Sequence, residues 1–171
     1  MTIRTNARIA GLTFFVYIAA GISALAMAGR PHATDMLSML TSFSALVLGV
    51  TLFAITREQD PDLALLALIC RVVEGIPGDG AIYFAVGSAI FSWLLLRGRM
   101  IPVALARLGV VASVLLVVII SLQHAGLFGG KASWSGGVTW LTWLPMLVFE
   151  MTLAVWLLVK GVAAPASRQF A

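Results

Sequence analysis

Six long runs of apolar residues, separated by short clusters of charged residues, glycine and proline, divide this chain of 171 residues. A lipid core offers no water to backbone amide and carbonyl groups, so only α-helices and closed β-barrels can cross it. No run alternates apolar and polar residues as a strand would. The sequence therefore predicts an all-α fold, a polytopic integral membrane bundle of six transmembrane helices over residues 8–28, 36–57, 62–77, 80–97, 102–124 and 139–160.

The composition supports a membrane protein and argues against a soluble one. Hydrophobic residues make up 61% of the chain and charged residues 11%, against about 45–50% and about 25% in soluble domains. The connections between the runs are short, which predicts one membrane domain over residues 1–171 in contact with the lipid bilayer. The 11 lysines and arginines are spread singly, without the basic stripe of a nucleic-acid-binding surface, so no nucleic-acid partner is expected.

The distribution of basic residues predicts the orientation of the helices. Loops that stay in the cytoplasm carry an excess of lysine and arginine, and tryptophan gathers at the membrane interfaces. Trp134, Trp140 and Trp143 then fall at the outer interface, which favours an aromatic belt over a ligand site. Both termini are expected in the cytoplasm, at a bacterial inner (plasma) membrane, because one side holds Arg4, Arg8, Arg57, Arg97, Arg99, Arg107, Lys160 and Arg168, and the other holds Arg30 and Lys131.

Small residues recur at helical spacing in the fourth run: Ala81, Ala85, Ser88, Ala89 and Ser92. Such a face lets helix backbones approach closely. It predicts tight packing within the bundle, and it also offers an interface for a homo-oligomer.

The third and sixth runs carry charges near mid-membrane. Translocon scales assign a cost of roughly 2.5–3.5 kcal/mol to an arginine at the centre of a membrane helix, so Arg71 needs a partner. Glu74 follows at i+3, on the same side of a helix. Glu150 lies halfway along the last run, at a similar expected depth. We therefore expect Arg71, Glu74 and Glu150 to form one site for ligand binding or proton exchange.

The charges of this predicted site do not balance. If Arg71, Glu74 and Glu150 all ionise, the site is negative, so a carboxyl is protonated or a cation or polar ligand supplies the balance. Pro145 is a secondary candidate, because it removes a helical hydrogen bond near Glu150 and predicts a kink or pocket. His124, near the outer end of the fifth run, is another. No cluster of histidines and cysteines has metal-ligand spacing, so neither a metal nor a cofactor is expected.

Four stretches of the sequence resemble one family. They cover five of the six runs and are AGLTFFVYIAAGI, LALLALICRVVEGI, GSAIFSWLLLRGRMIPVALARLGVV and LPMLVFEMTLAVWLLVKG. Together they are similar to the bacterial membrane proteins of domain of unknown function family 4386. Arg71 and Glu74 match the family pattern in the third run, and Pro145, Phe149 and Glu150 match it in the sixth. The resemblance implies a polytopic inner-membrane protein and supplies no reaction.

Three functions remain open from the sequence. The first is a buried Arg/Glu/Glu pocket that binds a small amphiphilic, hydrophobic or cationic ligand. The second is an intramembrane enzyme whose buried carboxyl exchanges a proton with a lipid-soluble substrate such as an isoprenoid. The third is a structural or accessory membrane subunit in which the charges only lock the helices together.

Overall fold

The computed structural model describes residues 2–76, 80–129 and 137–163, and these residues form helices and connecting turns without any strand. A short 3₁₀ helix, η1 (Leu127–Gly129), follows the fifth α-helix. The α-helices are α1 (Ile3–Ala26), α2 (Pro31–Thr56), α3 (Pro61–Glu74), α4 (Gly80–Arg97), α5 (Val103–His124) and α6 (Gly137–Val159).

All six predicted helices are present, but α1 and α2 begin earlier than predicted, each for a local reason. The side chain of Thr2 accepts a hydrogen bond from the backbone amide of Thr5 at 3.1 Å, which caps α1. α2 begins at Pro31 instead of residue 36, since proline fits the first helical turn, where its missing amide hydrogen costs nothing.

α3 is shorter than predicted and differs from the other helices. Asp60 caps its start by accepting from the amide of Leu63 at 3.1 Å, and the helix ends at Glu74, before Gly75, instead of reaching residue 77. Its 14 residues extend about 21 Å, less than the roughly 30 Å of a hydrocarbon core. Five helices, α1, α2, α4, α5 and α6, are long and apolar enough to cross a membrane.

Large apolar side chains are exposed on every α-helix. Soluble monomers rarely leave so much contiguous apolar surface open to solvent, so the outer surface of this bundle suits lipid. One example from each helix in order, with its exposed fraction, is Leu12 at 61%, Met39 at 74%, Leu65 at 48%, Trp93 at 49%, Val111 at 65% and Leu141 at 75%.

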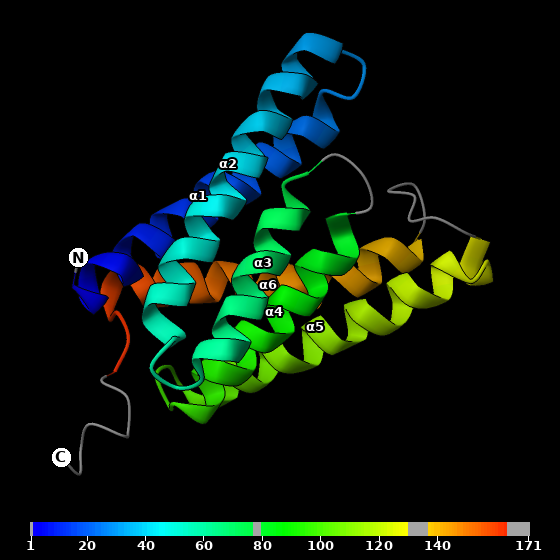
Figure 1. The fold of residues 1–171 in the computed structure, drawn as a ribbon. Coiled ribbons are helices and arrows are strands. Elements are labelled where there is room, and N and C mark those ends of the chain that lie inside the picture. The colour runs from blue at the N-terminus through cyan, green and yellow to red at the C-terminus, as the bar shows by residue number, and fades with distance from the viewer. Residues whose placement is uncertain (1, 77–79, 130–136, 164–171) are drawn as a thin grey trace, which may run out of the picture.

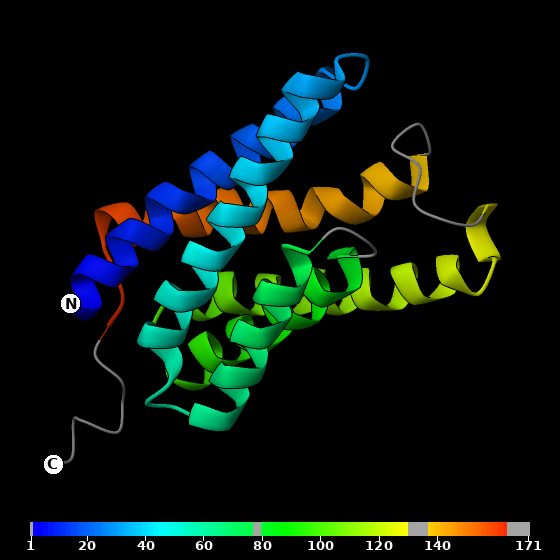
Figure 2. The ribbon, with the colours of Figure 1, turned by 45° about the horizontal axis from the view of Figure 1, so that its top comes forward.

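The α-helices form a closed ring. Each one packs against the next in the sequence, and α6 packs against α1, as can be followed in Figures 1 and 2. The N-terminus, the α2–α3 and α4–α5 connections and the end of α6 lie at the same end of the bundle (Figure 1). At that end Arg97 Nη1 lies 3.5 Å from Asp60 Oδ2, and the amide of Ala163 donates to the carbonyl of Met100 at 2.9 Å.

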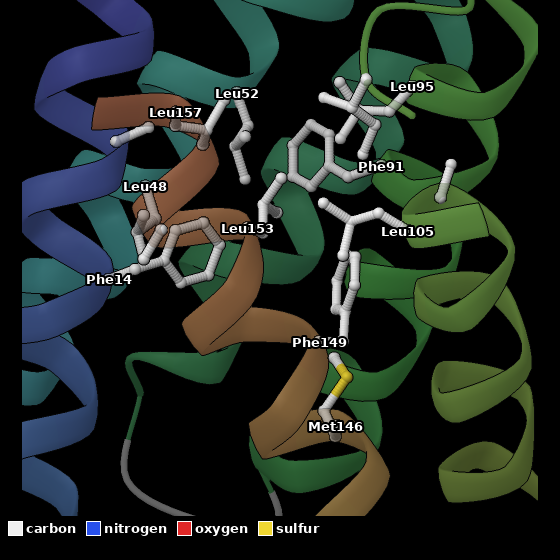
Figure 3. Packing of buried hydrophobic residues seen from close by; sticks show 14 of the residues in the cluster. Phe14, Leu48, Leu52, Phe91, Leu95, Leu105, Met146, Phe149, Leu153 and Leu157 are labelled. Atoms are coloured by element: carbon white, nitrogen blue, oxygen red, sulfur yellow. The ribbon is translucent and has the colours of Figure 1, made fainter. Parts of the chain in front are cut away.

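Apolar side chains fill the ring on the side of these connections. Figure 3 shows residues of α1, α2, α4, α5 and α6 pointing toward one another. α3 contributes only a small residue, Ala67, to this cluster. The main members are Phe14, Leu48, Leu52, Phe91, Leu95, Leu105, Phe149, Leu153 and Leu157.

Candidate functional site

α3 turns its small residues and one charge into the ring. Ala64, Ala67 and Arg71 recur at i, i+3 and i+7 and are buried, while Leu65 and Ile69 face outward. This spacing places the buried residues on one stripe of the helix. Arg71 is only 1% exposed and is the largest fully buried side chain among the described residues. A guanidinium therefore occupies the interior of the ring.

Glycines on the neighbouring helices make room for the bases of the Arg71 and Cys70 side chains. A Cβ added at Gly49 of α2 would lie 2.9 Å from Arg71 Cβ, and one added at Gly87 of α4 would lie 3.0 Å from Cys70 Cβ. Both distances are shorter than ordinary carbon–carbon contacts. The absence of a side chain at these positions therefore lets α2 and α4 pack closely on both sides of α3.

The guanidinium of Arg71 joins three helices. Its Nη1 donates to Oε2 of Glu74 at 2.9 Å and its Nη2 donates to the hydroxyl of Ser88 at 3.0 Å. Nη2 also lies 3.9 Å from Oε1 of Glu150, an ion-pair distance too long for a hydrogen bond. The predicted trio of Arg71, Glu74 and Glu150 is thus brought together, with Glu74 as the tight partner and Glu150 as the loose one.

Tyr17 of α1 completes the surroundings of Glu74. Its hydroxyl donates to Oε1 of Glu74 at 2.6 Å, a short distance typical of a hydrogen bond to a carboxylate. Both oxygens of Glu74 therefore have a donor, one from Tyr17 and one from Arg71.

Aromatic rings cover the guanidinium. Its central carbon lies 4.8 Å from the ring centroid of Phe84 and 6.0 Å from that of Tyr17, within the range of cation–π attraction. Phe84 stacks between Tyr17, at 6.3 Å, and Trp143 of α6, at 5.4 Å between centroids. This aromatic row links α1, α4 and α6.

Two polar atoms of the site lack a hydrogen-bond partner within the described part of the chain: Nε of Arg71 and Oε1 of Glu150. Both residues border a small cavity of about 10 Å³, together with Ser88, Ser92 and Phe149. A cavity needs about 10–15 Å³ of this kind of volume to hold one water molecule. The space beside Glu150 is therefore no larger than a single water.

A much larger groove, of about 950 Å³, lies on the other side of Glu150. α1 and α6 diverge away from the end of the bundle that carries the N-terminus (Figure 2), and their facing sides form its walls, with Thr41 of α2. Most of the lining is apolar. The polar or aromatic members are Tyr17, Thr41, Trp140, Trp143 and Glu150, and the smallest are Gly21, Ala26 and Ala28.

The secondary candidates have different positions. Pro145 lies inside α6, and its neighbours Leu144 and Met146 line the groove. His124 lies at the exposed end of α5, and its Nδ1 is 2.9 Å from the carbonyl oxygen of Ile120 in the preceding turn. The structure thus places Pro145 beside the groove and His124 apart from the charged site.

Sequence reasoning missed three contributors. Tyr17 carries no charge and lies in a helix that showed no polar signal. Ser88 was recognised only as part of a small-residue face. Trp143 was expected in an interfacial belt, but it is half-buried, stacks on Phe84 and lines the groove.

The described residues contain no group of three or more His, Cys, Asp or Glu side chains placed to hold a metal ion. The chemistry that the site does offer is a carboxylate and aromatic rings beside an apolar groove, backed by an enclosed guanidinium.

Removing the Tyr17 hydroxyl tests its role. Tyr17→Phe takes the donor from Oε1 of Glu74 and should lower the free energy of unfolding by about 1.5–3 kcal/mol, as expected for a hydrogen bond to a charged group. Thermal unfolding can be followed with a thiol-reactive fluorophore, since Cys70 is the single cysteine and is buried. Tyr83, the other tyrosine, is 44% exposed, so Tyr83→Phe is the control. Equal melting of both variants would contradict the assignment.

No curated protein and no solved structure matches the chain. One family model does, over a range that contains α4, α5 and α6 with Pro145 and Glu150 and begins after Arg71 and Glu74. Residues 79–161 match the family described as Domain of unknown function (DUF4386), which confirms the family resemblance predicted from the sequence.

Proposed function

We propose that this protein is a polytopic protein of the bacterial inner membrane that binds a small amphiphilic ligand in the groove between α1 and α6. The five long apolar helices and the exposed apolar surface support the membrane location. The polar head of the ligand would lie against Glu150 and its apolar part would fill the groove.

The arrangement of the chain ends supports six crossings with both termini in the cytoplasm. The start of α1 and the end of α6 lie at one end of the bundle (Figure 1), which requires an even number of crossings. α3 is then the sixth crossing, although it is short. At the same end lie Arg57 and Arg99, in the connections, and Arg97, the last residue of α4, and the positive-inside rule assigns this end to the cytoplasm.

One observation carries the ligand proposal: the Glu150 side chain lines the groove, while its enclosed Oε1, which faces Arg71 at 3.9 Å, has no hydrogen-bond donor among the described residues. A buried polar group without a partner is costly, and such groups are rare unless they serve a purpose. The groove volume of about 950 Å³ is at the upper end of the range of ligand pockets, roughly 300–1,000 Å³. A donor on a ligand head would meet the side of this carboxylate that lines the groove.

Filling the groove tests this proposal. A Cβ added at Gly21, which lines the groove, meets no atom within 4 Å, so Gly21→Leu should occupy ligand space without disturbing the packing. We expect at least tenfold weaker binding of decylamine to the protein in nanodiscs, measured by calorimetry.

Gly29 provides the matched control. A Cβ there also meets no atom within 4 Å, but Gly29 lies in the α1–α2 turn and outside the groove lining. Gly29→Leu should bind like the unchanged protein. Equal binding of decylamine by both variants would refute the proposal.

The alternative hypothesis is that the charges only hold the helices together. The direct ion pair between Arg71 and Glu74 at 2.9 Å is consistent with it. This hypothesis does not account for Glu150, which lines a groove and has only a loose ion pair at 3.9 Å, without a hydrogen bond to its Oε1 among the described residues. The two readings differ in whether the groove binds a ligand at all.

A further inference from the structure

Of the three buried charged side chains of the site, only Glu150 is among the described residues that line the groove. Glu150 borders both the small cavity and the groove, and its side chain is 6% exposed. Arg71 is 1% exposed and borders only the small cavity, while Glu74 borders neither. A ligand in the groove therefore meets a carboxylate and is separated from the guanidinium.

The charge at Glu150, when its carboxyl is ionised, is poorly compensated. Two carboxylates share one guanidinium, and the Arg71 hydrogen bonds go to Glu74 and Ser88. Glu150 keeps only the ion pair at 3.9 Å. In apolar surroundings the field of such a charge is much stronger than in water, so the inner end of the groove attracts positive charge.

Aromatic rings line the same groove. Tyr17, Trp140 and Trp143 all contribute to its wall. The faces of such rings attract cations, and tryptophan does so most strongly. A carboxylate combined with aromatic rings is the chemistry that recognises an ammonium group.

We propose that the head of the ligand is an ammonium group with a net positive charge, carried on a single apolar chain. This inference rests on the proposed ligand-binding function and specifies its chemical class. An N–H of the head donates to Glu150, the rings of Tyr17 and Trp143 flank the cation, and the chain lies along Gly21 and Leu25 toward the open part of the groove.

A zwitterionic phospholipid fits the groove less well than this ligand. Its ammonium group is covalently linked to a phosphate. The described residues that line the groove include no lysine, arginine or histidine to pair with that phosphate. The negative charge of Glu150 would oppose it. The charge of the groove therefore selects a simple lipophilic amine.

Chain-matched probes test the inference. Decylamine, which is positively charged at neutral pH, is compared with neutral decanol and with anionic decanoate, in nanodiscs of phosphatidylcholine. We expect decylamine to bind the unchanged protein at least tenfold more tightly than decanol, and decanoate to bind most weakly. In Glu150→Gln the ratio of the affinities for decylamine and decanol should fall to about one.

The outcomes separate this inference from the function on which it rests. If decanol binds as tightly as decylamine to the unchanged protein, and Gly21→Leu weakens both, the groove binds ligands but the ammonium assignment is wrong. If no probe binds, the proposed function itself fails. The comparison on the unchanged protein is decisive even where Glu150→Gln does not fold.

Two further arms address the aromatic wall and the source of the ammonium group. Trp143→Leu should weaken the binding of decylamine more than the binding of decanol, and an equal loss for both would overturn the role of the ring.

Addition of phosphatidylethanolamine to the nanodiscs should change the affinity for decylamine by less than twofold. A larger loss would show that the lipid head competes for the site and would overturn the selection of a simple amine.

Discussion

Replacing Arg71 with methionine should lower the free energy of unfolding by about 3–5 kcal/mol, because it leaves buried carboxylates without their cation. Glu74 would lose its contact at 2.9 Å and Glu150 its ion pair at 3.9 Å. Both glutamate side chains are less than one tenth exposed, so bulk water would compensate little of the lost charge. Thermal unfolding reported by labelling of Cys70 gives the readout.

A compensating variant separates the charge effect from the loss of packing. The triple change Arg71→Met, Glu74→Leu and Glu150→Leu removes all three charges and should recover most of the stability, since apolar replacements of buried ion pairs are often neutral or favourable. It should nevertheless fail to discriminate decylamine from decanol. A triple variant that is no more stable than Arg71→Met alone would contradict the electrostatic explanation.

Arg97 supplies the matched arginine control. It pairs with Asp60 at 3.5 Å, but its side chain is 54% exposed, and exposed ion pairs contribute about 0–1 kcal/mol. Arg97→Met should therefore melt close to the unchanged protein. A loss as large as that of Arg71→Met would show that the enclosed position of Arg71 is not the cause.

Gly11→Ala is expected to lower the free energy of unfolding by about 1–3 kcal/mol through overpacking. The added Cβ would lie 2.8 Å from the carbonyl oxygen of Ala154 and 2.8 Å from Cγ of Leu158, both in α6. The carbonyl belongs to the backbone, so the clash is relieved only by moving α1 away from α6. This contact closes the helical ring, and its loss should also change the shape of the groove.

Gly21→Ala is the matched control, because it makes the same substitution in the same helix. A Cβ at Gly21 meets no atom within 4 Å, and alanine is favoured over glycine inside a helix by roughly 0.5–1 kcal/mol. Gly21→Ala should therefore melt at or above the temperature of the unchanged protein. Similar melting temperatures for Gly11→Ala and Gly21→Ala would mean that the close approach of α1 and α6 does not support the ring.

The helices and one local ion pair could be predicted from the sequence because their causes lie within single segments. Apolar runs bounded by charged residues, glycine and proline determine where helices form in lipid. The spacing of Arg71 and Glu74 brings their heads together whatever surrounds them, and the structure shows this contact at 2.9 Å. The family match over residues 79–161 agrees with the resemblance in that part of the chain.

The remaining parts of the site depend on how each helix is rotated about its axis and on which helix is its neighbour. Tyr17 meets Glu74 across 57 positions of sequence only because α1 turns that face inward. Ser88 binds Arg71 rather than merely providing a smooth surface. An uncharged hydroxyl in an apolar helix gives no sign of its partner, so neither contact could be predicted.

The sequence by itself predicted a helical membrane bundle with an arginine and two glutamates near mid-membrane, since a charge buried in lipid requires a partner, but it did not show that the helices of Arg71 and Glu150 are neighbours. Only the tertiary structure decided how they are shared: Glu74 is satisfied by Arg71 and Tyr17, and Glu150 is left at the inner end of a groove. The physical reason is that α1 and α6 approach closely at Gly11 and then diverge. That divergence depends on the packing of the whole ring.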